Sequence, residues 1–163
     1  MVSSNASVKK LNVEHVTVRS NNSFAAVKAN LQSLVPTLDD GVWTLLRFGL
    51  ADRAREELEA APPLSIFGNR DHGVLLAIAG LKRRAIQYDI GNPLTASQMT
   101  RHNISAGLYA PIRVLLSENP GGGVAFEYDR PISTFGQFDD ESIDVVAQKL
   151  DASLLDVLQK AAS

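Results

Sequence analysis

The stretch RAIQYDIGNPLTASQM, residues 84–99, decides the fold that the sequence predicts. Its first half alternates between two sets of side chains, which is typical of a β-strand with two distinct faces. Gly91-Asn92-Pro93 then ends the strand, because glycine tolerates positive φ angles and proline has no N–H group to donate. Thr95 and Gln98 form a capping box, so a helix is expected to begin near Thr95. The stretch therefore predicts a strand, a hinge and a short helix.

The start of this helix is also a candidate binding feature. It places free backbone N–H groups and a partial positive charge beside the hinge. These groups could hold a carboxylate or a phosphate, or the Thr95 side chain could satisfy them already. The hinge is a structural requirement in either case, and a ligand-lining role for Gly91-Asn92-Pro93 is an additional hypothesis.

Further strands and helices are expected on both sides of this stretch. The patterns predict strands at 11–19, 64–69, 109–118 and 124–130, and helices at 22–36, at 39–60 with a break at Gly49, and at 140–160. In the final helix, the apolar residues form one buried stripe, and Asp151 and Gln148 are expected to lie off it. Residues 73–80 are small and apolar, and their pattern does not distinguish a strand from a helix.

Composition bounds the possible classes of function. The 163 residues contain no cysteine, which excludes disulfides, thiol nucleophiles and zinc–thiolate sites. No apolar run approaches the roughly 18 residues of a membrane span, and the polar start of the chain does not resemble a secretory signal. We therefore expect a single cytoplasmic domain over residues 1–163, with a flexible N-terminus at 1–10 and no membrane partner.

Charge is distributed unevenly along the chain. Residues 70–113 carry six Lys or Arg against two acidic residues, whereas residues 114–163 carry three against nine. The middle segment could receive an anion or a carboxylate-bearing ligand, or the charges could simply be solvated and paired between segments. Nucleic acid is not expected as a partner, because the pI is about 5.9 and no basic stripe lies on a predicted helix.

Several motifs together resemble the bacterial domain-of-unknown-function family 302. They are Asp71-His72, an Ala79-Gly80 step, Gly91-Asn92-Pro93 followed by Thr95 and Met99, and Tyr109-Ala110-Pro111 leading into a strand. The similarity extends from about Pro63 to Pro131. It departs from the family pattern at Ala110-Pro111, where Leu-Pro is usual, and at residues 38–61, which look like a helical insertion.

The resemblance implies an α+β fold of the TATA-box-binding-protein-like kind. In this fold, a curved antiparallel sheet of about five strands has helices packed on one face, in the order β-α-α-β-β-α-β-β-α. The family has no agreed activity, so the resemblance implies none for this chain.

The preferred functional hypothesis is a domain that binds a small, partly apolar and anionic molecule in a pocket between sheet and helices. Trp43 and Phe48 of the insertion could cover such a pocket or mediate self-association, with core packing as the default. No cofactor or metal is expected, because His72, His102 and Asp89 lack the close spacing of metal ligands. The predicted ligand-binding residues are His72, Arg84, Tyr88, Gly91, Asn92, Pro93, Thr95, Met99, Tyr109 and Arg113.

Two other classes of function stay open. One is a metal-free isomerase, lyase or hydrolase, with His72 as acid/base, Arg84 or Arg113 holding a carboxylate, and Tyr88 or Tyr109 assisting. The other is a purely structural or oligomer-forming protein in which the motifs only shape the fold. A homodimer is expected under any of the three.

Overall fold

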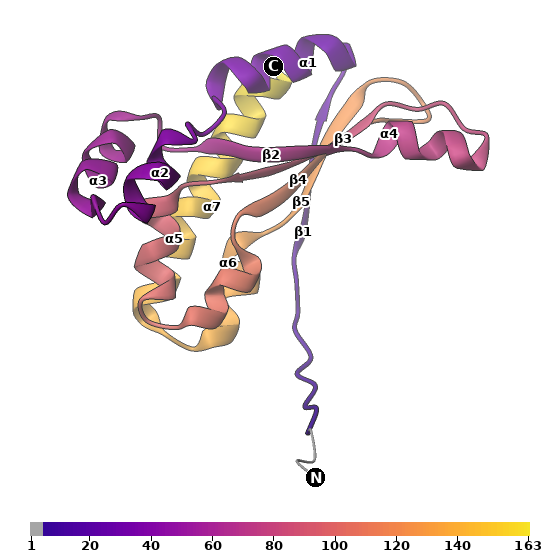
Figure 1. The fold of residues 1–163 in the computed structure, drawn as a ribbon. Helices are drawn as coiled ribbons and strands as arrows, with labels where there is room; N and C mark the ends of the chain where they lie inside the picture. Colours follow the sequence, from indigo (N-terminus) through magenta and orange to yellow (C-terminus); the bar gives the residue numbers. More distant parts are fainter. Residues whose placement is uncertain (1–4) are drawn as a thin grey trace.

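A five-stranded antiparallel sheet with the order β1-β5-β4-β3-β2 forms the centre of the molecule (Figure 1). The computed structural model describes residues 5–163. The strands are β1 (His15–Ser20), β2 (Ser65–Asp71), β3 (Ala85–Gly91), β4 (Ile112–Glu118) and β5 (Val124–Asp129). The sequence neighbours β2 and β3, β3 and β4, and β4 and β5 are also neighbours in the sheet, and β1 closes the far edge beside β5.

Helices connect the strands, and some of them cover one face of the sheet. They are α1 (Phe24–Leu34), α2 (Gly41–Arg47), α3 (Ala51–Ala60), α4 (His72–Leu75), α5 (Pro93–Thr100), α6 (Pro131–Phe135) and α7 (Glu141–Ala162). Short 3-10 helices follow at Leu76–Ala79 (η1), Ile104–Tyr109 (η2) and Gly136–Phe138 (η3). The long α7 contacts α1, α5 and α6, so these four helices form one layer (Figure 1).

The main core lies between this helical layer and the sheet. Alternate side chains of each central strand enter it, including Tyr88 of β3, Leu116 of β4 and Phe126 of β5, and all three are buried. The intervening residues, such as Gln87, Arg113 and Glu127, point to the opposite face, which we call the open face. A second, smaller core is formed inside the α2–α3 pair and reaches α5 through Leu94.

Polar side chains begin the main helices. The Ser23 hydroxyl accepts a hydrogen bond from the N–H of Ala26 at the start of α1. Asp140 does the same for α7, where its carboxylate accepts from the N–H groups of Ser142 and Ile143. Such caps satisfy backbone donors that have no partner inside the helix, so local sequence sets where these two helices begin.

The observed fold confirms the predicted α+β class, with its five-stranded antiparallel sheet and helices. The undecided residues 73–80 form the end of α4 and all of η1, closed by Gly80 in the left-handed conformation (φ 71°). The expected strand at 11–19 begins only at His15, where its ladder with β5 begins. Before it, the carbonyl of Glu14 accepts one backbone hydrogen bond, from the N–H of Arg130.

The prediction for Asp151 is wrong. This residue is only 9% exposed, and its Oδ2 accepts a hydrogen bond of 3.0 Å from Nε of Arg130. Arg130 also donates to Glu14, and these two hydrogen bonds raise the pKa of Arg130 above its ordinary value. The helical period alone did not predict this burial, because the partner that makes it tolerable lies 21 residues away.

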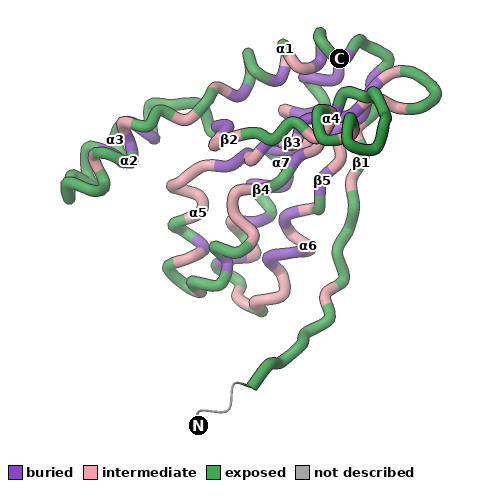
Figure 2. Tube along the Cα trace, turned by 45° about the vertical axis from the view of Figure 1, so that its right-hand side comes forward, coloured by how far each residue is buried: buried purple, intermediate pink, exposed green. Residues whose placement is uncertain are grey.

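The chain before β1 lies outside the helices and strands. Residues 1–4 of the expected flexible N-terminus lie outside the described residues, and residues 5–10 are exposed (Figure 2). Lys9 donates to the carbonyl of Gln137, and the Glu14 N–H donates to the hydroxyl of Ser133. Among the described residues, no helix is long and apolar enough to cross a membrane.

Candidate functional site

The hinge after β3 is fixed by the side chain of Asn92. Its Oδ1 accepts hydrogen bonds from the N–H groups of Leu94 (2.8 Å) and Thr95 (3.3 Å). Its Nδ2 donates to the carbonyl of Pro63 at 3.1 Å and so ties the hinge to the chain before β2. The predicted capping box at Thr95 is therefore wrong: Asn92 is the cap and α5 begins at Pro93. Proline suits this first position because its missing N–H would be unpaired there anyway.

This cap also bears on the predicted anion site at the helix start. Two of the N–H groups that could have held a carboxylate or phosphate already donate to Asn92. Because these donors are already engaged, they are not free to bind an anion as the hypothesis required.

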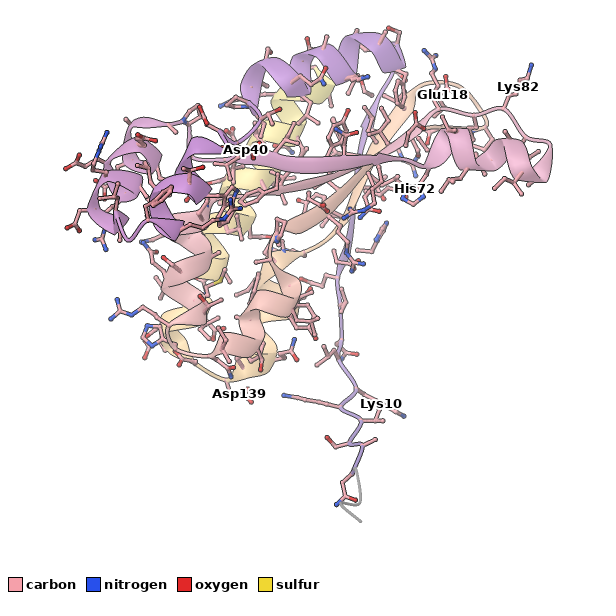
Figure 3. The ribbon with its side chains drawn as sticks, in the orientation of Figure 1. Lys10, Asp40, His72, Lys82, Glu118 and Asp139 are labelled. Carbon is pink, nitrogen blue, oxygen red and sulfur yellow. The ribbon has the colours of Figure 1, made fainter. Side chains whose placement is uncertain are left out.

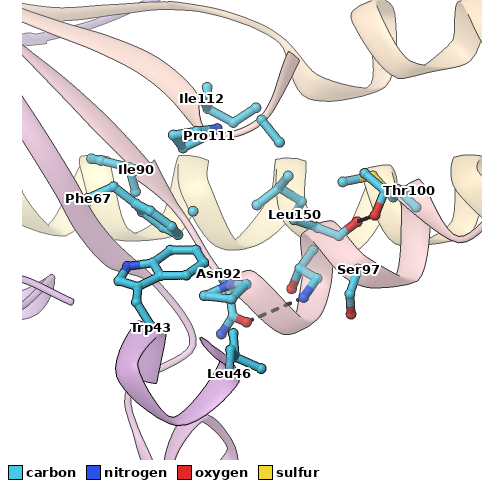
Figure 4. A pocket seen from close by; sticks show the side chains of 16 residues that line it. Trp43, Leu46, Phe67, Ile90, Asn92, Ser97, Thr100, Pro111, Ile112 and Leu150 are labelled. Carbon is cyan, nitrogen blue, oxygen red and sulfur yellow. Dashed lines mark hydrogen bonds between the residues drawn. The ribbon is translucent and has the colours of Figure 1, made fainter. Parts of the chain in front are cut away.

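An apolar pocket of about 370 Å³ lies beside the hinge (Figure 4). It opens where β3 and β4 meet α5, with α2 on one side and α7 on the other. Trp43 and Phe67 stand together at one side, with ring centroids 6.3 Å apart, and Leu150 lies across from them (Figure 4). The other lining residues are Leu46, Ile90, Gly91, Asn92, Pro93, Thr95, Ala96, Ser97, Met99, Thr100, Ala110, Pro111 and Ile112.

The pocket owes its space at one side to the absence of a side chain at Gly91. A Cβ atom there would lie 3.4 Å from Cβ of Pro111 and 3.6 Å from Cε2 of Phe67. These are ordinary van der Waals contacts, so a methyl group would fit and would narrow the hollow. Beside Gly91 in the pocket lining, the peptide bond between Ala110 and Pro111 is cis.

The few polar groups of the lining are mostly engaged with the backbone of α5. The hydroxyls of Ser97 and Thr100 donate to the carbonyls of Leu94 and Ala96. Within the described part of the chain, the Thr95 hydroxyl and the Trp43 N–H have no hydrogen-bond partner. No described lining residue is charged, so the pocket can accept an apolar body with one or two hydrogen-bonding groups.

The structure divides the ten predicted ligand-binding residues between this pocket and other parts of the molecule. Gly91, Asn92, Pro93, Thr95 and Met99 line the pocket together. The remaining five, His72, Arg84, Tyr88, Tyr109 and Arg113, do not.

One of these five is buried and a second is half-buried against the core. Tyr88 is buried in the main core, and burial, followed by the charge of Asp71, raises the pKa of its hydroxyl. Tyr109 packs edge-on against the rings of Phe135 and Phe138, at centroid distances of 6.3 and 6.2 Å.

Of the other three, Arg113 and His72 line the open face, and Arg84 lies at the end of β3 beside α1. Arg113 is exposed on the open face. Arg84 pairs with Glu118, and this hydrogen-bonded contact lowers the pKa of the Glu118 carboxyl below its ordinary range. The guanidinium of Arg84 also lies 5.1 Å from the ring centre of Phe24.

His72 occupies the junction between β2 and α4 (Figure 3). Its Nε2 lies 2.9 Å from Oε1 of Gln87, so the ring is oriented by a neutral amide. The neighbouring Asp71 carboxylate accepts from the N–H of Val74 and caps α4. Within residues 5–163, no three His, Asp or Glu side chains cluster as a metal site would require.

Several pocket residues could not be assigned to the site from the sequence. Phe67 and Leu150 come from β2 and α7, and their apolar character predicts only burial. Trp43 carried a signal, as an aromatic residue in the apparent insertion, and the structure places it 37% exposed at the pocket.

Comparisons with known proteins agree with the resemblance seen in the sequence. The model of the family "Domain of unknown function DUF302" matches residues 49–161. A crystal structure of an uncharacterised conserved DUF302 protein from Bacillus stearothermophilus is similar, with 14% sequence identity and a TM-score of 0.66. The similarity covers 90% of this chain and 97% of that one, and at this identity it shows the fold alone. No curated protein matches the chain.

Proposed function

This chain belongs to the DUF302 family of domains of unknown function, and we propose that it binds a small, predominantly apolar and uncharged molecule in the pocket beside Asn92. The observation that supports this most is the uncharged, largely apolar lining of a hollow of about 370 Å³. Ligand sites in proteins are typically concave, roughly 300–1,000 Å³ in volume and lined by apolar and aromatic side chains with a few polar groups.

The lining favours an uncharged ligand over the anion suggested by the charge of the middle segment. An ionised group in an apolar hollow loses its hydration, and no described lining residue is a Lys or Arg that could compensate. The Thr95 hydroxyl, which has no hydrogen-bond partner among the described residues, offers a hydrogen bond to a neutral hydroxyl or carbonyl. His72 lies outside this pocket, so an acid/base role for it is not part of the proposal.

Trp43 makes the proposal directly measurable, because it is the only tryptophan in the chain and it lines the pocket. We would titrate the protein with 1-adamantanemethanol and with 1-adamantanecarboxylate, which share one apolar body and differ in charge. The alcohol should shift Trp43 emission and raise the melting temperature, with stabilisation of about 2.7 kcal/mol at 100 times its Kd. The carboxylate should bind at least about tenfold more weakly.

A matched pair of variants localises the effect. Ala96→Phe fills the pocket from α5 and should abolish the response to the alcohol. Ala152→Phe makes the same change on an exposed position of α7 and should leave the response intact.

Two results would contradict the proposal. One is an absence of response to a broad set of apolar alcohols, ketones and amides, together with native mass spectra that contain no co-purified small molecule. The other is an unchanged response in a folded Ala96→Phe variant, which would place the binding elsewhere.

A further inference from the structure

Residues 72–81 form an apolar projection that we call the arm. It comprises α4, η1, Gly80 and Leu81, and it extends beyond the end of the sheet (Figure 1). Ile78 is 89% exposed and Val74 is 68% exposed, and Leu75 and Leu81 are also largely exposed. Beyond His72, the arm contains no polar side chain. A helical segment that is apolar on all sides is normally buried, so this exposure calls for a partner surface.

The base of the arm is held firmly against β3. A Cβ atom at Gly73 would lie 2.5 Å from the Arg83 carbonyl oxygen and 3.0 Å from the Ala85 nitrogen, so only glycine fits there. Asp71 caps the first turn, and His72 contacts Gln87 of β3. These contacts fix the orientation of the arm, and they hold its apolar residues away from the chain's own core.

The open face of the sheet provides a receiving surface next to the arm. A hollow of about 910 Å³ lies over β3, β4 and β5, and the arm forms one of its walls through Leu75, Leu76 and Ile78. Its floor includes Ala85 and the half-buried Leu115. No described helix other than those of the arm contributes to its lining.

We propose that two copies of this chain associate about a two-fold axis, with the arm of each copy lying on the open face of its partner's sheet. A two-fold interface requires one patch that is complementary to itself. The arm and the hollow lie side by side on the same surface, so one patch supplies both the projecting and the receiving part. This inference is independent of the pocket beside Asn92.

Charge on the two parts is also complementary. Lys82 follows the arm and points outward (Figure 3), while Glu127 lines the hollow. Neither has a salt-bridge partner within residues 5–163, whereas Arg84 and Glu118 nearby pair with each other. A partner copy that places its arm in the hollow brings Lys82 toward Glu127. The hollow also contains Asp129 and the exposed Arg113, so its acidic residues outnumber its one arginine.

The open face supplies about half of the surface that each partner buries in a standard-size dimer. Five strands about 4.8 Å apart and about six residues long, at about 3.3 Å per residue, span roughly 20 by 20 Å. The flat face of the sheet therefore has an area of about 400 Å², to which the uneven side-chain surface and the arm add. An interface of the standard size, roughly 800 Å² per partner, therefore requires the arm as well as the sheet.

The first test measures the mass of the full chain in solution by light scattering and by sedimentation. The wild-type protein should have twice the mass of one chain. Ile78→Asp should raise the Kd of the dimer by a factor on the order of 100 without unfolding the protein, since an unpaired charge would be buried only in the dimer. Phe48→Asp is the matched control: Phe48 is 78% exposed on the α2–α3 side, and its replacement should leave the dimer intact.

The second test uses a charge exchange. Lys82→Glu and Glu127→Lys should each weaken the dimer about three- to tenfold, and the double exchange should restore most of the affinity. Restoration identifies a second copy as the partner, because both changes occur in the same chain.

Three outcomes would overturn the proposal. The first is a wild-type monomer at concentrations of about 100 μM. The second is a dimer whose Kd is unaffected by Ile78→Asp. The third is a monomer that binds vesicles of phosphatidylserine and phosphatidylcholine through Ile78, which would assign the arm to a lipid surface instead.

Discussion

The two faces of the sheet use the same strands in opposite ways. On β4, Leu116 is fully buried beneath the helices, whereas the adjacent Leu115 is half-buried on the open face. The covered face carries almost only apolar side chains, while the open face carries an ion pair between Arg70 and Asp89 and the exposed Arg113. A shift of one residue along a strand therefore moves a side chain from the core to the open face.

The largest expected effect contrasts these two leucines. Leu116→Ala removes a fully buried side chain and should lower the free energy of unfolding by about 2–5 kcal/mol. Leu115→Ala should cost less than about 1 kcal/mol in the monomer, because its surroundings are already partly solvated. Urea denaturation of both variants, at a concentration where the protein is monomeric, measures the difference. Equal losses would show that the open face is packed like a core.

The sequence predicted much of this division, because it follows from alternation. Tyr88 falls with Ile86 and Ile90, and all three are buried on the covered face. Arg113 falls between two apolar residues of β4, and register pairs it with Asp89 rather than with Tyr88. Grouping Arg113 with Tyr88 in one predicted site was therefore inconsistent with the same alternation that predicted the strands.

The pocket was only partly predictable from the sequence. Gly91, Asn92 and Pro93 were found because a hinge has local signals, namely a glycine, a capping residue and a proline. Phe67 and Leu150 were not, because periodicity predicts which side of an element is buried and not where packing leaves a void. The cap was assigned to Thr95 although asparagine is the stronger capping residue, and the structure uses Asn92.

A second contrast is between the pKa of the Tyr128 hydroxyl in the folded chain, where it lies on the covered face, and its ordinary value in the unfolded chain. Burial, followed by the charge of Asp151, raises its pKa to about 12, from an ordinary value of 10.0. Above pH 10 the unfolded chain releases this proton more readily than the folded chain does. The titration of Tyr128 therefore leaves the free energy of unfolding unchanged below pH 10 and lowers it as pH rises towards 12. The loss attributable to Tyr128 should reach about 2 kcal/mol at pH 12, and Tyr88 acts in the same direction.

Tyr128→Phe isolates this contribution. The hydroxyl is buried and has no hydrogen-bond partner among the described residues, so the variant should be equally stable or up to about 1 kcal/mol more stable at pH 7. Its stability should then decline less than that of the wild type between pH 10 and 12, as measured by chemical denaturation at each pH. A destabilised variant at pH 7 would mean that the hydroxyl is satisfied in solution.

A third contrast compares the two strand-to-helix junctions. Asn92 caps α5, which packs against α7, and Asp71 caps α4, which projects into solvent as part of the arm. Asn92→Ala should lower the free energy of unfolding by about 1–2 kcal/mol, because it removes the cap and the tie to Pro63. Asp71→Ala should cost about 0.5 kcal/mol, since local fraying of an exposed helix disturbs little packing.

Thermal and urea unfolding of both variants provide the measurement. Asn92→Asp is the matched control at the first junction, because its carboxylate can still accept from Leu94 and Thr95 but cannot donate to Pro63. A loss for Asp71→Ala as large as that for Asn92→Ala would show that the arm is packed in solution, which only a partner can provide.

The smallest expected effect concerns the ion pair between Arg70 and Asp89 on the open face. One guanidinium nitrogen of Arg70 donates to both carboxylate oxygens of Asp89, at 3.0 and 2.8 Å, but the Arg70 side chain is well exposed. Solvent screens such a pair, so Arg70→Gln should change monomer stability by less than about 1 kcal/mol, and by still less in 0.5 M NaCl. Urea denaturation at low and high salt, with the protein dilute enough to be monomeric, tests this. If the same substitution has a larger and salt-insensitive cost at high protein concentration, the pair must be withdrawn from solvent there. The open face would then be covered only when a second chain is present, and its charges would belong to an interface rather than to a free surface.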